Sequence, residues 1–241
     1  ITLGIYRRVP ILIKEGDPDG NPWGISFMQG LFNMTTDSHL FRTREQLEAE
    51  GWTLEGNVFH RNGQEMLPLY QGIMSSPFDH RAADVIRSET ALKRQNQPGY
   101  LSIAEKQDPF RVARPMYWLP GEEVLERLGS WREPWLLTFR DVTSPTNERT
   151  LVSTVTPRAA VGHKTPLVLS EHNNLALHAL LSSFVVDYLS RQKVGGTSMT
   201  YFFVRQFPVV SPDGLAQIPD WATCSFEVFV TQRSLELHYT S

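Results

Sequence analysis

One stretch of the chain places cations, an amide and hydroxyls close together, a combination suited to contacting a nucleic acid. It reads Phe139-Arg-Asp-Val142 and continues as Pro145-Thr-Asn-Glu-Arg-Thr150. An arginine can read guanine through two hydrogen bonds, an asparagine can read adenine, and hydroxyls can bind phosphate. The alternative is a turn closed by an ion pair between Arg149 and Asp141, and the sequence favours neither. The candidate DNA-binding residues are Arg140, Thr146, Asn147, Arg149 and Thr150.

A second stretch follows the strongest helical pattern of the chain and holds two cations and a pair of glycines. In Ser190-Arg-Gln-Lys-Val-Gly-Gly-Thr-Ser198 the glycines would let the backbone approach a phosphate that the two cations neutralise. Ordinary capping of a helix C-terminus also places glycine and basic residues there, because cations oppose the helix dipole. Capping is the better explanation of this stretch taken alone. Its candidate DNA contacts are Arg191, Lys193, Gly195 and Gly196.

A third stretch, near the end of a predicted hairpin, brings together an aromatic ring, a histidine and an arginine. It runs from Leu67 to Gly72 and resumes as Phe78-Asp-His-Arg81. A packed hairpin corner explains these residues at least as well as DNA contact does. The candidate residues are Tyr70, His80 and Arg81.

The sequence lacks the motifs of catalysis. A methyltransferase that uses S-adenosylmethionine needs a glycine-rich turn after its first strand, and no segment fits it. The Asn/Asp-Pro-Pro-aromatic loop of such enzymes has its nearest match in Asn21-Pro-Trp23, which lacks the second proline. No Gly-Lys-Ser/Thr run occurs, Asp79-His80 fits a capped turn, and Ser182-Ser183 lacks the glycines of a nucleophile elbow. We predict no catalytic residue, no cofactor site and no metal ligand in this chain.

Composition limits the class of protein. The chain has 241 residues, 41% of them hydrophobic, which is typical of one large globular domain or two small ones. The formal net charge is −3, so any nucleic-acid binding needs local basic patches or positive charge from neighbouring parts of a longer protein. The single Cys224 excludes a disulfide framework and a zinc finger, and it suits a reducing cytoplasm. No apolar run approaches the ~18 residues of a membrane span.

Periodicity and turn chemistry predict the elements that hold these stretches. Residues 43–50 favour a helix that stops at Gly51. Asn62-Gly63 predicts a tight hairpin, because both central residues of such a turn need a positive φ. Further helices are expected over 79–93 and 122–128, and strands over 135–142 and 150–156.

The clearest helix is expected over residues 173–191, where apolar residues recur every three or four positions and Asn173 or Asn174 can cap the start. Residues 5–13, 201–210, 225–230 and 235–239 are expected to be extended. Strands and helices mix without a regular strand-helix-strand alternation. The predicted fold class is therefore α+β, with mixed or antiparallel twisted sheets and packed helices.

Taken together and in order, these stretches resemble the C-terminal part of large adenine-N6 DNA methyltransferases. That family includes fused type IIG restriction-modification enzymes and the methylases of BREX- and DISARM-type phage defence. The landmarks span almost the whole chain. They are Ile5-Tyr-Arg-Arg-Val-Pro10, Met34-Thr-Thr-Asp-Ser-His-Leu-Phe41, Leu67-Pro-Leu-Tyr70, Phe78-Asp-His-Arg81, Phe139-Arg-Asp141, Thr146-Asn-Glu-Arg-Thr150, Asp187-Tyr-Leu-Ser-Arg-Gln-Lys-Val-Gly-Gly196, Gln206-Phe-Pro208 and Glu236-Leu-His-Tyr-Thr240.

The resemblance implies a TaqI-like target-recognition region that binds double-stranded DNA sequence-specifically and presents an adenine for flipping and methylation. The chain would then be a piece of a longer cytoplasmic protein that uses S-adenosylmethionine. Residues 1–75 would connect to an upstream methyltransferase domain, and residues 76–241 would form the recognition domain. The sequence departs from the family at Gln71-Gly-Ile-Met74, where an acid and a lysine are usual, so a phosphate contact of that lysine would be lost.

Two other functions stay open. The segment could brace the methyltransferase or dock other defence subunits, and an exposed apolar patch with the arginines held in ion pairs would indicate this. An independent hydrolase or nuclease would need clustered carboxylates, and no spacing in the sequence provides them.

Overall fold

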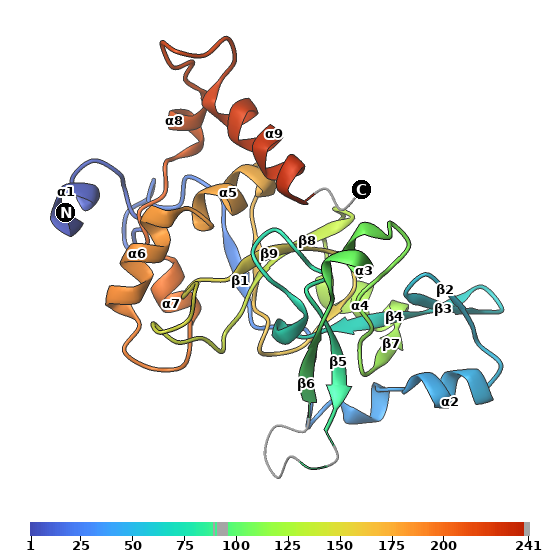
Figure 1. Ribbon diagram of the computed structural model, residues 1–241. Helices are drawn as coiled ribbons and strands as arrows, with labels where there is room; N and C mark the ends of the chain where they lie inside the picture. The colour runs from blue at the N-terminus through green and yellow to red at the C-terminus, as the bar shows by residue number, and fades with distance from the viewer. Residues whose placement is uncertain (89, 91–95, 239–241) are drawn as a thin grey trace.

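The chain folds as α+β, as the sequence predicts, with two separate larger sheets, a projecting hairpin, and helices gathered mainly on one side (Figure 1). The computed structural model describes residues 1–88, 90 and 96–238. Among these residues, no helix has the length and apolar character needed to cross a membrane.

The first sheet is antiparallel, with the strand order β1-β11-β8-β9. Its central strand β8 is buried on both faces, because successive side chains of a strand point to opposite sides. Leu137 packs into the core beneath the helices, whereas Leu136 packs into the core shared with the second sheet. The strands are β1 (Ser26–Met28), β8 (Trp135–Phe139), β9 (Ser153–Pro157) and β11 (Leu167–Leu169).

The second sheet is built around the long strand β4, which pairs with β3, β7 and β10. The turn between β3 and β4 has a positive φ at Asn62 and Gly63, 50° and 77°, so the predicted hairpin is confirmed. The β10–β4 pair is parallel, whereas β4 is antiparallel to β3 and β7. The strands are β2 (Thr53–Glu55), β3 (Val58–Arg61), β4 (Gln64–Tyr70), β7 (Trp118–Pro120) and β10 (Ala160–Val161).

The C-terminal helices pack on the first sheet and form the largest core. Leu177, Leu181 and Leu189 meet Leu137 and Phe207 there, and all five are buried. The sequence predicted one helix over 173–191. It is interrupted at Ser182-Ser183, where the Ser183 hydroxyl caps the second helix by accepting from Val186 N. The helices are α5 (Asn174–Leu181), α6 (Phe184–Lys193), α7 (Tyr201–Val204), α8 (Pro212–Ala216) and α9 (Phe226–His238).

Shorter helices complete the body. The predicted helix over 43–50 is confirmed, and Thr43 and Gln46 form a capping box at its start while Gly51 follows it with a φ of 82°. The predicted helix over 122–128 is also confirmed. These elements are α1 (Thr2–Tyr6), α2 (Arg44–Ala49), α3 (Ile103–Gln107), α4 (Gly121–Leu128) and the 3-10 turns η1 (Ser38–Leu40) and η2 (Gly72–Met74).

Strands β5 (Ala83–Arg87) and β6 (Asn96–Tyr100) pair only with each other and form a hairpin that projects from the body (Figure 1). The helix expected over 79–93 is therefore wrong for residues 83–87, while residues 89 and 91–93 lie outside the described part of the chain. The hairpin takes this region because Asp84 is held by the 111–114 segment, a contact that the sequence pattern does not reveal.

The four stretches expected to be extended contain helical residues instead: α1 reaches residues 5–6 of the first, α7 takes residues 201–204 of the second, and α9 covers most of the other two. In α9 the apolar residues at 226, 228, 229 and 230 satisfy both an alternating and a helical pattern. Packing against α5 resolves this ambiguity, because a helix lets Phe226 and Val230 reach the same core.

Strand pairing crosses the predicted division between residues 1–75 and 76–241. Strand β1 pairs with β11 in the first sheet, and β4 pairs with β7 and β10 in the second. Both larger sheets therefore draw on both segments.

Candidate nucleic-acid interface

Residues 139–150 lie between the two other stretches predicted to contact DNA. On one side, the Arg140 guanidinium donates to the carbonyl of Ser75 and lines a pocket with Gln71 and Gly72. On the other side, Thr143 N donates to Thr197 O at 3.0 Å, next to the Gly195-Gly196 pair. The fold thus brings parts of all three predicted stretches to one segment.

Arg191 fixes the shape of the loop in this segment. Its Nε donates to Asp187 Oδ2 at 3.0 Å, its Nη1 donates to Pro145 O at 3.0 Å, and its Nη2 donates to Glu148 O. The second carboxylate oxygen of Asp187 accepts from Thr150 N at 2.7 Å. We call these contacts the Asp187–Arg191 network. Arg191 is therefore a positioning residue, and the loop it holds exposes Thr146 and Asn147.

The ion pair between Arg149 and Asp141 considered from the sequence does not form. Asp141 instead accepts from Lys164 Nζ at 2.7 Å. The Arg149 guanidinium lies over the Phe184 ring, 4.2 Å from its centroid, in a cation–π contact. The positive charge of Arg149 is thus not neutralised by that carboxylate.

A cavity of about 280 Å³ opens beside Arg140, and we call it the Arg140 pocket. Burial lowers the pKa of Arg140, and burial together with Lys164 lowers the pKa of His163, so desolvation disfavours the charged form of both side chains. The rest of the lining combines apolar side chains with Gln71, Lys164 and Thr165. Such a lining suits a group with acceptor atoms on an edge and an apolar face. The lining residues are Met34, Gln71, Gly72, Ile73, Arg140, Val142, Gly162, His163, Lys164 and Thr165.

Lys193 and the paired glycines lie at the end of α6. Lys193 Nζ donates to Gln206 Oε1 at 2.9 Å and lies 5.4 Å from the centroid of the Tyr6 ring. Gly195 and Gly196 are exposed, and no heavy atom lies within 4 Å of the place where a Cβ would stand. Their backbone is therefore open to a ligand.

Three of the predicted DNA contacts have structural roles instead. Arg81 is buried, and its guanidinium donates to the backbone carbonyls of the 106–111 segment, at 2.7 Å for Arg111 O. Tyr70 and Thr150 are also buried, and desolvation raises the pKa of Tyr70. The assignment of these three residues to DNA contact is corrected, because their polar groups do not reach the surface. His80 is half-buried, and burial lowers its pKa to about 4, so a contact with DNA would be made by the neutral ring.

One arrangement resembles a nucleophile and its base. Ser182 Oγ lies 3.2 Å from His178 Nε2, which also faces Ser153 O at 3.1 Å. His178 is fully buried, and desolvation lowers the pKa of its ring to about 3, so it is a poor base at neutral pH. In the described part of the chain, its Nδ1 has no hydrogen-bond partner to orient the ring. The pair therefore belongs to the packing between α5 and β9.

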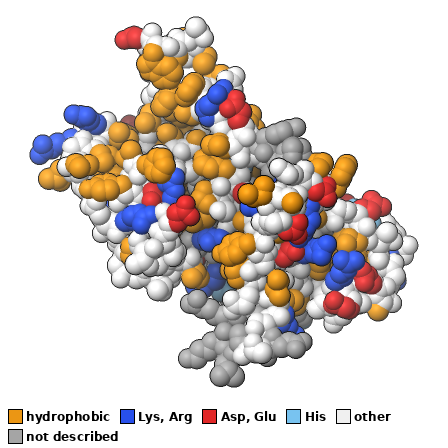
Figure 2. Space-filling view, in the orientation of Figure 1, with side chains coloured by type: hydrophobic (Ala, Val, Ile, Leu, Met, Phe, Trp, Pro, Cys, Tyr) orange, Lys and Arg blue, Asp and Glu red, His pale blue; other side chains and the backbone are white. Residues whose placement is uncertain are grey.

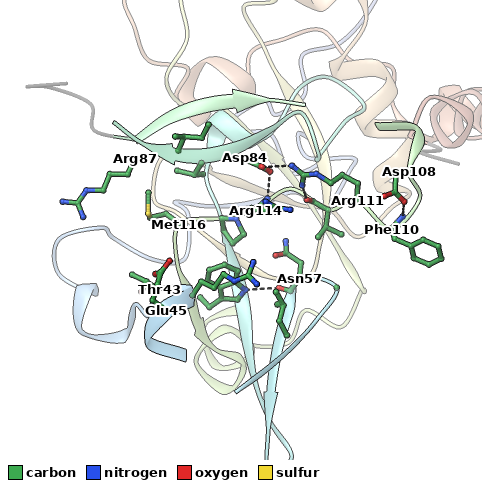
Figure 3. Close-up of a pocket in the computed structure, with 18 residues that line it drawn as sticks. Thr43, Glu45, Asn57, Asp84, Arg87, Asp108, Phe110, Arg111, Arg114 and Met116 are labelled. Atoms are coloured by element: carbon green, nitrogen blue, oxygen red, sulfur yellow. Dashed lines mark hydrogen bonds and ion pairs between the residues drawn. The ribbon is translucent and has the colours of Figure 1, made fainter. Parts of the chain in front are cut away.

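A cleft of about 910 Å³ lies between β5, the start of α2 and residues 108–118 (Figure 3). Asp84 lies at its wall and accepts from Arg111 Nη2 at 2.6 Å and from Arg114 N at 2.8 Å. Arg87 points away from the cleft. Carboxylates and arginines alternate around this cleft, so it presents no concentrated charge of either sign.

The four cations among the candidate DNA contacts of the first two stretches do not form one basic cleft. Arg140 lies inside its pocket, Arg191 faces the loop that it holds, and Arg149 and Lys193 lie at opposite ends of α6. Figure 2 shows basic side chains interspersed with hydrophobic and acidic ones on this face. Sequence reasoning missed Lys164 and His163. The signal that could have indicated them is the run Gly162-His163-Lys164, in which a glycine lies close to a cation. No family model and no curated protein matches this chain.

Within residues 1–88, 90 and 96–238, no three His, Cys, Asp or Glu side chains are grouped so as to hold a metal ion.

Proposed function

We propose that this chain binds double-stranded DNA and recognises its sequence, as part of an adenine-specific DNA methyltransferase of a restriction-modification or phage-defence system. The observation that carries the proposal is the position of residues 139–150. Two further stretches that the sequence nominates as DNA contacts meet this segment, since Gln71 and Gly72 line the Arg140 pocket and Thr197 O accepts from Thr143 N.

The exposed groups of this surface suit a duplex. Thr146 and Asn147 offer a hydroxyl and an amide, and the Gly195-Gly196 turn offers open backbone. Arg149 and Lys193, which form no ion pair among the described residues, supply charge for phosphates, which position a protein on DNA, while the amide and the Arg140 pocket would contact base edges. S-adenosylmethionine would bind to an upstream methyltransferase domain, because the sequence here has no glycine-rich turn for it. The proposal implies a cytoplasmic protein.

Salt dependence tests this proposal directly. Binding of the chain to a fluorescein-labelled duplex is measured by anisotropy between about 50 and 200 mM salt, because each neutralised phosphate contributes about −0.9 to the slope of log K against log salt. We expect Arg149→Gln and Lys193→Gln each to make the slope shallower by about 0.9. Arg61→Gln, on the exposed end of β3, is the matched control and should leave the slope unchanged. If neither substitution changes the slope of log K against log salt, the assignment of these cations to phosphate contact is refuted.

A second candidate function, docking of another protein domain, is favoured by the C-terminal arm. Ile218 and Trp221 before α9, and Leu235 and Leu237 on it, are all more than half exposed. If this arm docks the upstream methyltransferase domain, that domain expressed as a separate polypeptide should bind the chain. Trp221→Glu and Leu235→Glu should weaken this binding and leave DNA affinity unchanged.

A further inference from the structure

Two aromatic rings on α6 face solvent although burial would stabilise them. Phe184 is 80% exposed, and Tyr188 follows it by one helical turn and is also exposed. Residues four apart on a helix lie on the same face, about 5–6 Å apart. Tyr6 of α1 adds a third ring at the far end of α6, where Thr2 Oγ1 donates to Gln192 Oε1 at 3.0 Å and joins the two helices.

Cations lie at both ends of this row of rings. Arg149 covers Phe184 at one end, and Lys193 lies over Tyr6 at the other. A helix of ten residues is about 15 Å long, so Arg149 and Lys193 lie about that far apart along α6, and the nine residues from Phe184 to Lys193 turn these two side chains to different sides of the helix. We call Arg149, Phe184 and Tyr188, which share one side, the α6 strip. In Figure 2 hydrophobic and basic side chains lie next to one another over the region of α1 and α6.

The strip carries excess positive charge on a chain whose net charge is −3. Arg149 and Lys193 form no ion pair with any carboxylate in the described residues, and neither do the exposed Arg7 and Arg8 that follow α1. The carboxylate of Asp187, on the same helix, is already neutralised by Arg191. A ligand for this strip must therefore be anionic and must offer flat apolar faces to the rings.

We propose that the α6 strip binds an unpaired stretch of nucleic acid, with bases stacked on Phe184 and Tyr188 and a phosphate next to Arg149. Stacking on exposed rings flanked by cations is how proteins hold single strands without reading their sequence. An acidic protein surface suits the α6 strip less well than a nucleic acid does. The Arg149 guanidinium covers one face of Phe184, so the two groups form a flat platform that matches a planar base. This inference deepens the proposed function, since it rests on DNA being the partner and adds a single-stranded form of it.

Anisotropy with a labelled oligothymidine tests the proposal. We expect the intact chain to bind it with a salt-dependent affinity, and Phe184→Ala and Tyr188→Ala each to weaken that binding about tenfold, the effect of losing one stacked base. Both substitutions should leave duplex affinity unchanged, whereas Arg149→Gln should lower both affinities. Phe110→Ala is the matched control, because Phe110 is 88% exposed on a distant loop, and it should have no effect.

The outcomes separate the two proposals. If the duplex is not bound while oligothymidine binding depends on Phe184, the proposed function fails and the inference stands. If a folded Phe184→Ala variant binds oligothymidine as tightly as the intact chain, the inference is overturned and the duplex result is untouched. Full affinity in Phe184→Leu would also overturn it, since leucine keeps the apolar surface and removes the stacking ring, and it would point to a protein partner instead.

Discussion

Replacing Arg191 with glutamine should destabilise the whole chain, because one guanidinium ties α6 to the loop that carries Thr146 and Asn147. The substitution removes the charge-assisted bond to Asp187 and the bonds to the carbonyls of Pro145 and Glu148. Among the described residues, the backbone N–H of Thr150 is then the remaining hydrogen-bond donor to the buried Asp187 carboxylate.

The magnitude follows from the burial of the two partners. A hydrogen bond to a charged group contributes about 1.5–3 kcal/mol, and removal of one partner of a buried pair costs about 3–5 kcal/mol. Asp187 is 9% exposed but Arg191 is 35% exposed, so water replaces part of what is lost. We therefore expect Arg191→Gln to lower the free energy of unfolding by about 2–3 kcal/mol.

Urea denaturation followed by tryptophan fluorescence measures this loss as a shift of the midpoint at constant slope. Arg44→Gln is the control, because Arg44 and Glu48 form an ion pair of the same sequence spacing with side chains 48% and 49% exposed. That exposed pair should contribute about 0.3–0.5 kcal/mol. If Arg191→Gln costs no more than Arg44→Gln, the loop is not held by this network and the reasoning is refuted. Faster hydrogen exchange at Thr150 N in the Arg191 variant would locate the effect.

The remaining predictions concern pH and close backbone packing. Desolvation lowers the pKa of the His178 ring from 6.5 to about 3. Between these two pH values the unfolded chain binds a proton at this ring and the folded chain does not. The free energy of unfolding should therefore be independent of this group above pH 6.5 and fall below it, by up to about 1.4 kcal/mol per pH unit. His178→Gln should reduce that pH dependence in urea titrations at pH 7, 6 and 5. A Cβ at Gly30 would overlap the carbonyl oxygen of Gly162, so Gly30→Ala should lower the free energy of unfolding by about 1–3 kcal/mol. Gly4→Ala in α1 has open space around it and should be neutral or stabilising by up to about 1 kcal/mol, and equal effects of the two glycine variants on the melting temperature would contradict the packing argument.

Local chemistry made part of the fold predictable from the sequence. The turn at Asn62-Gly63, the stop at Gly51 and the cap at Asn173 each depend on a few neighbouring residues, and all three are confirmed. The projecting hairpin was not predictable, because the contacts that hold Asp84 come from residues 27 and 30 positions away. Likewise, α9 has an ambiguous pattern until α5 provides the surface it packs on.

The candidate site was predictable only as a set of stretches. Residue types selected Arg191, but whether its guanidinium faces DNA or the carbonyl of Pro145 depends on where α6 meets the loop. Burial likewise removed Arg81 and Tyr70 from the candidate contacts, although their types suit DNA. Chemistry can therefore nominate such residues, whereas tertiary packing decides which of them stay exposed.

The acidic net charge does not argue against a nucleic-acid partner once the charges are placed in space. A phosphate in physiological salt responds to charges within about 8 Å, the screening length, and not to the sum over the chain. Around α6 and residues 139–150, the carboxylates of Asp187 and Asp141 are each compensated by a cation at 3.0 Å or less. Arg149 and Lys193 are left uncompensated by carboxylates within the described residues. Glu148 is an exposed carboxylate of the same segment, but the cations Arg140, Arg149, Lys164, Arg191 and Lys193 outnumber Asp141, Glu148 and Asp187. The local balance is therefore positive, so raising the salt concentration should weaken binding at this face.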